Sequence, residues 1–162
     1  MITRKSDLAI RALRTLAAGP GQVPRTSPQR PARRADSSPR SGPGTVRGVE
    51  LADAIGTSRG FLGQAMTPLV RAGWVSSMPG PLGGYRLQPA ARPSVLEVIE
   101  AIEGPTDTGA CVLDADEVCA AATDGARQPC ALHDAWIRAQ RAMRDELFSS
   151  PAVPTTHVSN LH

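Results

Sequence analysis

Apolar residues recur at helical spacing in several stretches of the chain, and the first stretch lies near its start. Apolar positions from 9 to 17 repeat every three or four residues, which places them on one face of a helix. Thr3 or Ser6 is available to cap the start of this helix, and Gly19 followed by Pro20 ends it. The pattern predicts an amphipathic helix over most of the segment before the glycine.

Two further helices are predicted close together. Residues 48–56, GVELADAIG, form a short periodic segment with a terminal glycine, and Thr57 or Ser58 then caps a second segment whose period continues to residue 70. Pro68 lies inside the second segment and lacks the N–H of a helix interior, so we expect it to kink that helix or end it early. Helix, tight turn and helix over this length are typical of a helix-turn-helix motif.

A short hairpin is predicted directly after these helices. Two extended runs, Trp74–Val75 and residues 85–87, flank the sequence PGPLGG, whose glycines permit the positive φ angles of a turn. A two-stranded wing in this position favours a winged-helix module. A small helical domain with an incidental hairpin stays open as the alternative.

The second half of the chain predicts two helices separated by a loop. Residues 94–103 carry apolar positions on one face, with Ser94 as a candidate cap. Residues 104–129 lack any period, and residues 131–148 predict a long helix whose apolar face exceeds what such a small domain can cover. A second copy of the chain would bury that face. The expected fold class is therefore mainly α with a small β wing: a winged helix-turn-helix domain plus a long C-terminal dimerisation helix.

Composition divides the chain into parts. We expect a winged helix-turn-helix DNA-binding domain over residues 1–90, interrupted by a disordered insertion at 19–47 that holds six prolines and few large apolar side chains. Residues 91–148 supply the linker helix, the cysteine-rich loop and the dimerisation helix, and residues 149–162 form a flexible tail. The insertion is either an inert linker or a tail that itself binds DNA.

The distribution of charge along the chain indicates what kind of partner the protein binds. The net charge of +3 is unevenly distributed, because residues 19–47 hold six arginines and one acid whereas residues 91–162 hold five arginines and eleven acids. The basic N-terminal half indicates a phosphate-backbone partner, and 3% aromatic residues are too few for stacking on single strands. With no secretory signal and no run of about 20 apolar residues, we expect a protein of the reducing cytoplasm that binds no membrane.

Three cysteines and one histidine lie within residues 111–133. They are Cys111, Cys119, Cys130 and His133, and the last two are close together at the start of the predicted terminal helix. A flexible loop can gather three thiolates around one centre, and a helix N-terminus stabilises ionised sulfur. On ligand types alone, a tetrahedral zinc ion and an iron–sulfur cluster both fit, and cysteines that bind nothing are a third interpretation.

Four blocks of the sequence resemble one family of regulators. The blocks are DLAIRALRTLA, LVRAGWVSSMPGPLGGYRL, LEVIEAIEGP and the cysteine-rich loop that closes with CALHDAW. In this order they resemble the bacterial IscR/NsrR family of winged-helix transcription regulators, over nearly all of the chain except the insertion and the tail. The resemblance implies a homodimer that binds a palindromic operator in double-stranded DNA. It also implies a 2Fe–2S or 4Fe–4S cluster in each subunit that responds to nitric oxide, redox state or cluster supply.

Single residues can be matched to the family's ligands. Cys111, Cys119 and Cys130 correspond to its three cysteine ligands, and His133 corresponds to the histidine that IscR-type members use as the fourth. Asp7 corresponds to an aspartate that some nitric-oxide-sensing members lend across the dimer. We favour the histidine because it needs no second subunit. The gap between the second and third cysteines is longer than the family usually has.

The residues expected to contact DNA lie on the second helix of the motif and on the wing. The wing arginine common in relatives is Pro79 here, and a glutamate that helps some members to read bases is Gly63, so the resemblance does not carry over the operator preference. The remaining candidates are Ser58, Arg59 and Gln64 at the start of the recognition helix, with Arg71 and Arg86 on phosphates.

The expected function is a DNA-binding transcription regulator, a repressor or an activator, whose operator affinity is controlled by an iron–sulfur cluster. An enzyme is not expected, because the sequence offers no paired carboxylates or Ser-His-Asp series, and GPLGG lacks the Lys and Ser/Thr of a P-loop. The alternatives are a zinc- or thiol-based regulator on the same scaffold and, from another class, a small iron–sulfur electron-transfer protein.

Overall fold

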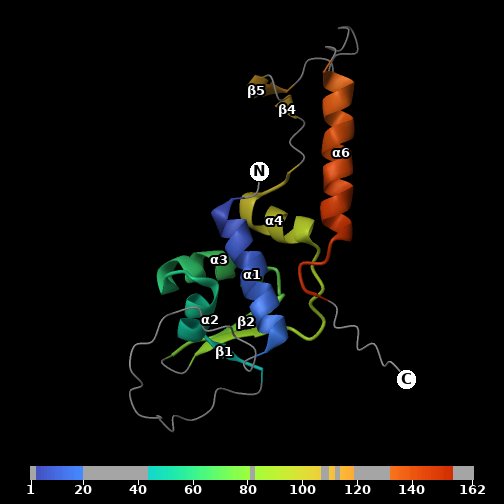
Figure 1. Ribbon diagram of the computed structural model, residues 1–162. Coiled ribbons are helices and arrows are strands. Elements are labelled where there is room, and N and C mark those ends of the chain that lie inside the picture. Colours follow the sequence, from blue (N-terminus) through green and yellow to red (C-terminus); the bar gives the residue numbers. More distant parts are fainter. Residues whose placement is uncertain are drawn as a thin grey trace, which may run out of the picture.

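The computed structural model describes residues 3–19, 44–80, 83–106, 110–111, 114–118 and 132–154. Its helices are α1 (Arg4–Ala18), α2 (Gly48–Ile55), α3 (Arg59–Arg71), α4 (Val95–Glu103) and α6 (His133–Ser149), and its strands are β1 (Val46–Arg47), β2 (Val75–Met78), β3 (Gly84–Leu87), β4 (Ala110–Cys111) and β5 (Asp114–Val118). Helices α1 to α4 and the sheet of β1 to β3 gather at one end of the molecule, and α6 extends away from them toward the β4–β5 hairpin (Figure 1). The predicted fold class, mainly α with a small β wing, is confirmed.

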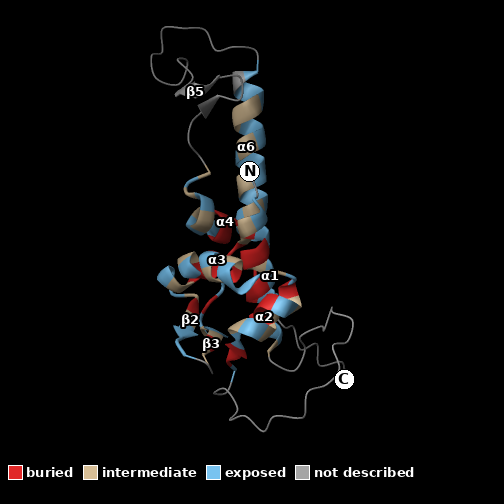
Figure 2. Cartoon of the chain, turned by 90° about the vertical axis from the view of Figure 1, so that its left-hand side faces the viewer, coloured by how far each residue is buried: buried red, intermediate tan, exposed pale blue. Residues whose placement is uncertain are grey.

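Helix α1 lies at the centre of the core. Thr3 caps it by accepting a hydrogen bond from the Lys5 amide at 3.2 Å, and its apolar face packs against α2, α3 and α4. Figure 2 shows the buried residues grouped where these helices meet. Among the described residues, the largest fully buried apolar side chains are Leu13, Leu51, Leu62, Met66, Leu69, Ile99, Val46 and Val98. Burial of this apolar surface is the main stabilising contribution to the fold. In the described part of the chain, no helix has the length and apolar character needed to cross a membrane.

Helices α2 and α3 form the predicted helix-turn-helix. Helix α2 ends at Gly56, which adopts the left-handed conformation with a φ of 70° and donates its amide back to the helix. Ser58 then caps α3 by accepting a hydrogen bond from the Phe61 amide at 3.3 Å. Pro68 does not end α3, which continues to Arg71, so the prediction of an early end is wrong. The helix tolerates the missing hydrogen bond because its inner face is buried in the core.

The wing has three strands in the described structure, rather than the two predicted. Strand β3 lies between β2 and β1 and pairs antiparallel with both, with Val75 opposite Leu87 and Val46 opposite Tyr85. A Cβ atom at Gly84 would lie 2.1 Å from the carbonyl oxygen of Val46, so a glycine is required where β1 approaches β3. The predicted hairpin is confirmed, and β1 is an addition to it.

Strand β1 falls within residues 19–47, for which composition predicts disorder. That prediction is wrong for residues 44–47, because Val46 is fully buried and pairs with the wing. It is also wrong for Gly19, which closes α1 by donating its amide to the helix. The rest of the predicted insertion, residues 20–43, lies outside the described residues.

The segment after α6 packs back onto the core. The Val95 amide donates to the Ser150 carbonyl at 2.8 Å, and the Ala152 amide donates to the Pro93 carbonyl at 3.0 Å. Ala152 and the valine that follows it are buried and join the core cluster. The prediction of a flexible tail is therefore wrong for residues 149–154, because their apolar side chains and backbone groups are held by the core. The remainder of that predicted tail lies outside the described residues.

Candidate nucleic-acid interface and metal centre

Helix α3 begins with polar residues that face solvent. Ser58, Arg59 and Gln64 are all exposed, and the Ser58 hydroxyl accepts the capping hydrogen bond from the Phe61 amide. The opposite face of the helix is buried in the core. The first turns of α3 therefore present amide groups and polar side chains outward, which is the arrangement of a recognition helix.

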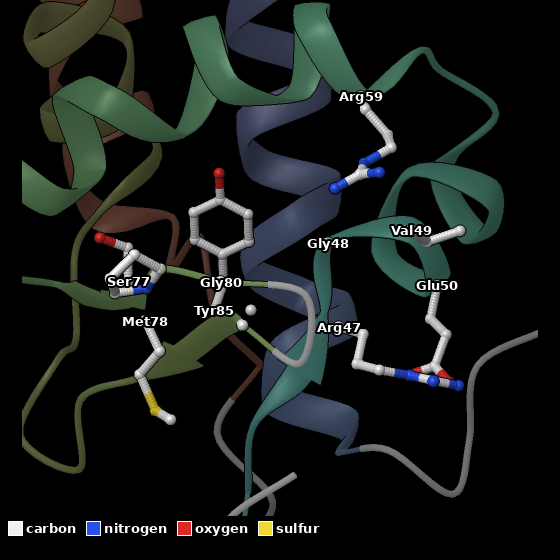
Figure 3. Close-up of a pocket in the computed structure, with 12 residues that line it drawn as sticks. Arg47, Gly48, Val49, Glu50, Arg59, Ser77, Met78, Gly80 and Tyr85 are labelled. Carbon is white, nitrogen blue, oxygen red and sulfur yellow. The ribbon is translucent and has the colours of Figure 1, made fainter. Parts of the chain in front are cut away.

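A hollow of about 580 Å³ lies between the start of α3 and the wing. Its walls include Arg59 of α3, Arg47 of β1, Glu50 of α2 and Tyr85 of β3. Figure 3 shows Arg59 reaching from α3 on one side of the hollow and Tyr85 standing on the strand at the other side. The backbone of a bound duplex can pass between a recognition helix and a wing, so this hollow is a candidate for phosphate contacts.

A second hollow, of about 280 Å³, follows the exposed side of α3. Gly63, Thr67 and Arg71 line it from the helix, and Ser77 and Tyr85 line it from the wing. A Cβ atom at Gly63 would meet nothing within 4 Å, so the helix backbone is open to approach there. Tyr85 and Ser77 line both hollows.

All three predicted DNA-binding arginines retain unneutralised charge. Arg59, Arg71 and Arg86 are exposed, and within the described ranges none of them forms an ion pair. Arg59 and Arg71 lie at opposite ends of α3, and each lines one of the two hollows. Their positive charge is available to DNA at both ends of the recognition helix.

Sequence reasoning missed two residues of this surface, Arg47 and Tyr85. The Nε of Arg47 donates to the Glu50 carboxylate at 2.9 Å, and this hydrogen bond, reinforced by the opposite charge, raises the pKa of the guanidinium. The sequence RGVE carried a signal for the pair, because it places opposite charges three residues apart at a helix start. Tyr85 is the single tyrosine of the chain, but only the fold brings it beside α3.

Two of the predicted metal ligands, Cys111 and His133, belong to elements at the end of the molecule opposite the wing. Cys111 ends β4 and pairs with Asp114 of β5, and His133 is the first residue of α6 (Figure 1). The predicted ligands Cys119 and Cys130 lie outside the described residues. Within the part of the chain that the structure describes, no group of three or more His, Cys, Asp or Glu residues is arranged to hold a metal ion.

The donor set fits an iron–sulfur cluster or a zinc ion by its chemistry. Three thiols and an imidazole are soft and borderline ligands that both centres accept. Leu132, the N-cap residue of α6, makes no side-chain capping hydrogen bond, so among the described residues no side chain caps the first amide groups of this helix, where the positive end of its dipole lies. That environment favours ionised thiolates.

The alternative fourth ligand, Asp7, lies in the first turn of α1. Its carboxylate is 3.7 Å from the guanidinium of Arg11 one turn later, and both side chains are exposed. An exposed pair of this kind is weakly held, so it leaves the aspartate accessible to a second subunit. The structure therefore separates the two candidate ligands, with the aspartate on the core helix and His133 on α6.

Comparison with known proteins decides the family. A family model described as Rrf2, an iron-dependent transcriptional regulator, matches residues 2–150. The chain belongs to the Rrf2 family. A proposed HTH-type transcriptional regulator of Neisseria meningitidis serogroup A is 35% identical to this Rrf2 protein over 107 residues, which cover 65% of this chain and 68% of that one. A proposed rrf2-like regulator of Rhodobacter capsulatus is 33% identical over 106 residues, covering 65% of this chain and 59% of that one.

Solved structures agree on the fold of this Rrf2 protein. CymR, the global cysteine regulator of B. subtilis, superposes with a TM-score of 0.61 at 22% identity, covering 94% of this chain and 92% of that one. IscR of T. potens superposes with a TM-score of 0.55 at 19% identity, covering 94% and 82%. The predicted resemblance is confirmed. The chain is a helix-turn-helix-type transcriptional regulator of the Rrf2 family, DNA binding follows from that family role, and its relatives are regulators rather than enzymes.

Proposed function

We propose that this Rrf2 protein is a homodimer that binds a palindromic operator with an affinity that depends on an iron–sulfur cluster. The observation that carries the proposal is the set of three cysteines and one histidine within residues 111–133, in a chain whose family model is described as iron-dependent. Thiolates and imidazoles are known ligands of such clusters. We expect the protein to act in the reducing cytoplasm, where these thiols stay free of disulfides.

DNA recognition is assigned to α3 and the wing. Arg59 and Gln64 would read base edges in the major groove, because both are exposed in the first two turns of α3. Arg71 and Arg86 would bind phosphates, since both are exposed; Arg71 lines the hollow along α3, whereas Arg86 lines neither hollow and lies beside Gly44. Ser58 would add a phosphate contact at the helix N-terminus.

Dimerisation is assigned to the exposed apolar face of α6. Leu132, Met143 and Phe148 are 51%, 55% and 62% exposed, which is unusual for large apolar side chains. Leu132, Ala135, Ala139 and Met143 are exposed and recur at intervals of three and four residues, so they share one face that is narrow enough for close helix packing, whereas Phe148 lies on another side of the helix. A second copy of this helix would cover the face, and the twofold symmetry would set two recognition helices on the two halves of a palindrome.

Cluster binding is assigned to Cys111, Cys119, Cys130 and His133. The cluster, when bound, would supply a redox-active centre that oxidants and nitric oxide can attack. Because Cys111 ends β4 and His133 begins α6, ligands held together would also hold these two elements together. Helix α6 packs against α4, and α4 packs against α1 and α3, so the position of the ligand-bearing elements can influence the DNA-binding domain.

The deciding experiment is anaerobic purification followed by analysis of iron, acid-labile sulfide and zinc. We expect iron and sulfide together with visible absorption, and we expect Cys119→Ala to abolish that absorption while the protein remains a dimer. DNA from upstream of its own gene should bind in a salt-sensitive way, and the affinity should change when the cluster is removed. A preparation without iron and sulfide whose DNA binding is unaffected would reject the proposal.

A thiol-based or zinc-based regulator is the second candidate. The observation in its favour is the shared fold with CymR, whose described role is cysteine regulation. A colourless sample whose DNA affinity changes on oxidation and recovers on thiol reduction would support the thiol mechanism, and stoichiometric zinc would support the metal one. A small electron-transfer protein would show no salt-sensitive DNA binding.

A further inference from the structure

The carboxylate of Glu100, near the end of α4, joins three parts of the chain. It accepts hydrogen bonds from the Thr106 amide at 3.1 Å and the Thr106 hydroxyl at 2.7 Å, and it pairs with Arg144 of α6 at 2.8 Å. Arg144 also donates to the Thr106 hydroxyl. Thr106 stands five residues before Cys111, on the stretch that leaves α4. One side chain therefore holds both the long helix and the start of the cysteine-bearing segment.

Glu103, three residues further along α4, bonds to a different helix. Its carboxylate accepts hydrogen bonds from the hydroxyls of Thr3 and Ser6 at the start of α1, and Ser6 is fully buried. The Arg4 guanidinium, between these two residues in the chain, lies 6.0 Å from the centroid of the Phe61 ring in the first turn of α3. Direct contacts thus run from the end of α4 through α1 to the recognition helix.

The other end of α4 is fixed. Ser94 and Glu97 form a reciprocal capping box, in which the Ser94 amide donates to the carboxylate at 2.7 Å. The Val95 amide is bound to the Ser150 carbonyl at 2.8 Å. The start of α4 is thus held to the C-terminal end of α6, which Ser150 caps, whereas a displacement of Thr106 or of Arg144 acts on the end of α4 that carries the two bridging carboxylates.

We propose that the last turn of α4 is the connection by which the state of the cysteine-bearing segment sets the position of α3. Glu100 holds α4 in place while Thr106 and Arg144 stay together. Glu103 then links any shift of α4 to α1. Helix α1 contacts the recognition helix α3 through Arg4 and Phe61, so the shift also reaches α3. Packed interfaces switch between discrete arrangements, so a small shift is sufficient. The inference rests on the proposed cluster-dependent function, but the residues it names are neither cluster ligands nor DNA contacts.

The test measures the ratio of two dissociation constants, with and without the cluster, for one duplex that the loaded wild-type protein selects from a random-sequence library. Coupled sites typically give a ratio of about 5 to 150. Thr106→Val removes the hydroxyl at constant size and Glu100→Gln removes the charge. We expect each to reduce the ratio by about 2- to 30-fold. Thr106→Ser keeps the hydroxyl and should retain the wild-type ratio.

A matched pair on α6 separates the contact from a general effect of charge. Arg144→Met should reduce the ratio, whereas Arg141→Met, an exposed arginine on the same helix, should not. Iron content is measured beside each dissociation constant. If Thr106→Val, Glu100→Gln or Arg144→Met loses its iron, the ratio for Glu103→Gln tests the inference instead. This variant weakens the contact between α4 and α1, which lies away from the cysteine-bearing segment.

The outcomes separate the inference from the function on which it rests. A merely structural role would weaken the loaded and cluster-free forms equally, and unchanged ratios in Thr106→Val, Glu100→Gln and Glu103→Gln would overturn the inference alone. A wild-type protein that binds the duplex equally well with and without its cluster would overturn the proposed function and the inference with it.

Discussion

The Nε of Arg14 in α1 donates a hydrogen bond to the carbonyl oxygen of Ala152 at 3.2 Å, so the first helix holds the segment that follows the last one. Ala152 is fully buried at this point. The chain between these two residues includes the helix-turn-helix, the wing and the cysteine-bearing segment. The contact fixes the C-terminal end of α6 beside the DNA-binding domain, whereas the helix begins at His133, toward the β4–β5 hairpin.

Loss of this C-terminal contact should destabilise the whole domain. Ala152→Asp would bury an unpaired charge in the core, and we expect the free energy of unfolding to fall by about 2 kcal/mol or more. Pro151→Ala, at the exposed neighbouring position, should change it by less than about 0.5 kcal/mol. Urea denaturation monitored by circular dichroism measures both. Equal stabilities for the two variants would show that the segment is not part of the folded core.

Two glycines should respond to alanine with opposite signs. Gly56 has a φ of 70° at the end of α2, where an L side chain is strained, so Gly56→Ala should cost about 1 kcal/mol of stability. Gly63 lies inside α3 with nothing within 4 Å of an added Cβ, so Gly63→Ala should stabilise by up to about 1 kcal/mol. Thermal unfolding of both variants provides the measurement, and shifts of the same sign would contradict the conformational argument.

The helices could be predicted because their signals are local. Thr3, Gly56 and Ser58 take the capping positions that their sequence context indicates, and the terminal helix begins at His133, close to the predicted residue 131. Strand β1 has only two residues and no alternating pattern, and its partner strand lies far along the chain. A strand of that length is recognised only by its pairing with another strand, so a prediction from composition placed it in the insertion.

The candidate site could be predicted only in part, for the same reason. The exposure of Arg59 and Arg71 follows from the helical period of α3. The hollow lies between α3 and the wing, and its size depends on the distance between these two elements. The position of Tyr85 in its wall therefore could not be predicted without the fold. The contact between Glu100 and Arg144 joins residues 44 apart in the chain, and no local pattern specifies such a pair.

The arginines of the candidate interface should differ in how their loss affects DNA binding. Arg71→Ala and Arg86→Ala should weaken binding to all sequences and lower the slope of log affinity against log salt by about 1 each, as expected for phosphate contacts. Arg59→Ala should cost about 1–3 kcal/mol and relax the preference at one base position. Titrations at several salt concentrations, with exposed Arg141→Ala on α6 as the control, test the assignment. If neither Arg71→Ala nor Arg86→Ala changes the salt slope, these two arginines do not belong to the interface.

The two candidate fourth ligands should be separable by single substitutions. If His133 completes the set, His133→Ala should lower the iron and sulfide retained per protomer, because a cluster with three protein ligands is less firmly held. Asp7→Ala should leave both values unchanged and remove only the exposed pair with Arg11. Anaerobic metal analysis of the two variants decides between them, and the reverse pattern would assign the fourth ligand to the aspartate.

The two bridging carboxylates of α4 should make stability depend on acid pH. The Thr106 hydroxyl and amide, followed by Arg144, lower the pKa of Glu100 from its ordinary value of 4.5, and the hydroxyls of Ser6 and then Thr3 lower the pKa of Glu103. Because the folded pKa is the lower one, the unfolded chain binds more protons in this range and stability rises with pH. The contribution is complete above the ordinary pKa and is lost as pH falls through the folded values.

Substitution of these carboxylates should therefore act mainly above that range. The double variant Glu100→Gln and Glu103→Gln should be less stable than the wild type near neutral pH, and the difference should shrink as the pH falls below about 4. Ser6→Ala keeps the Glu103 carboxylate and removes its strongest donor, so it should lose part of the same acid dependence. Denaturation midpoints measured from neutral to acid pH give the comparison. A double variant that loses stability equally at every pH would show that these contacts stabilise the fold without regard to the charge of the carboxylates.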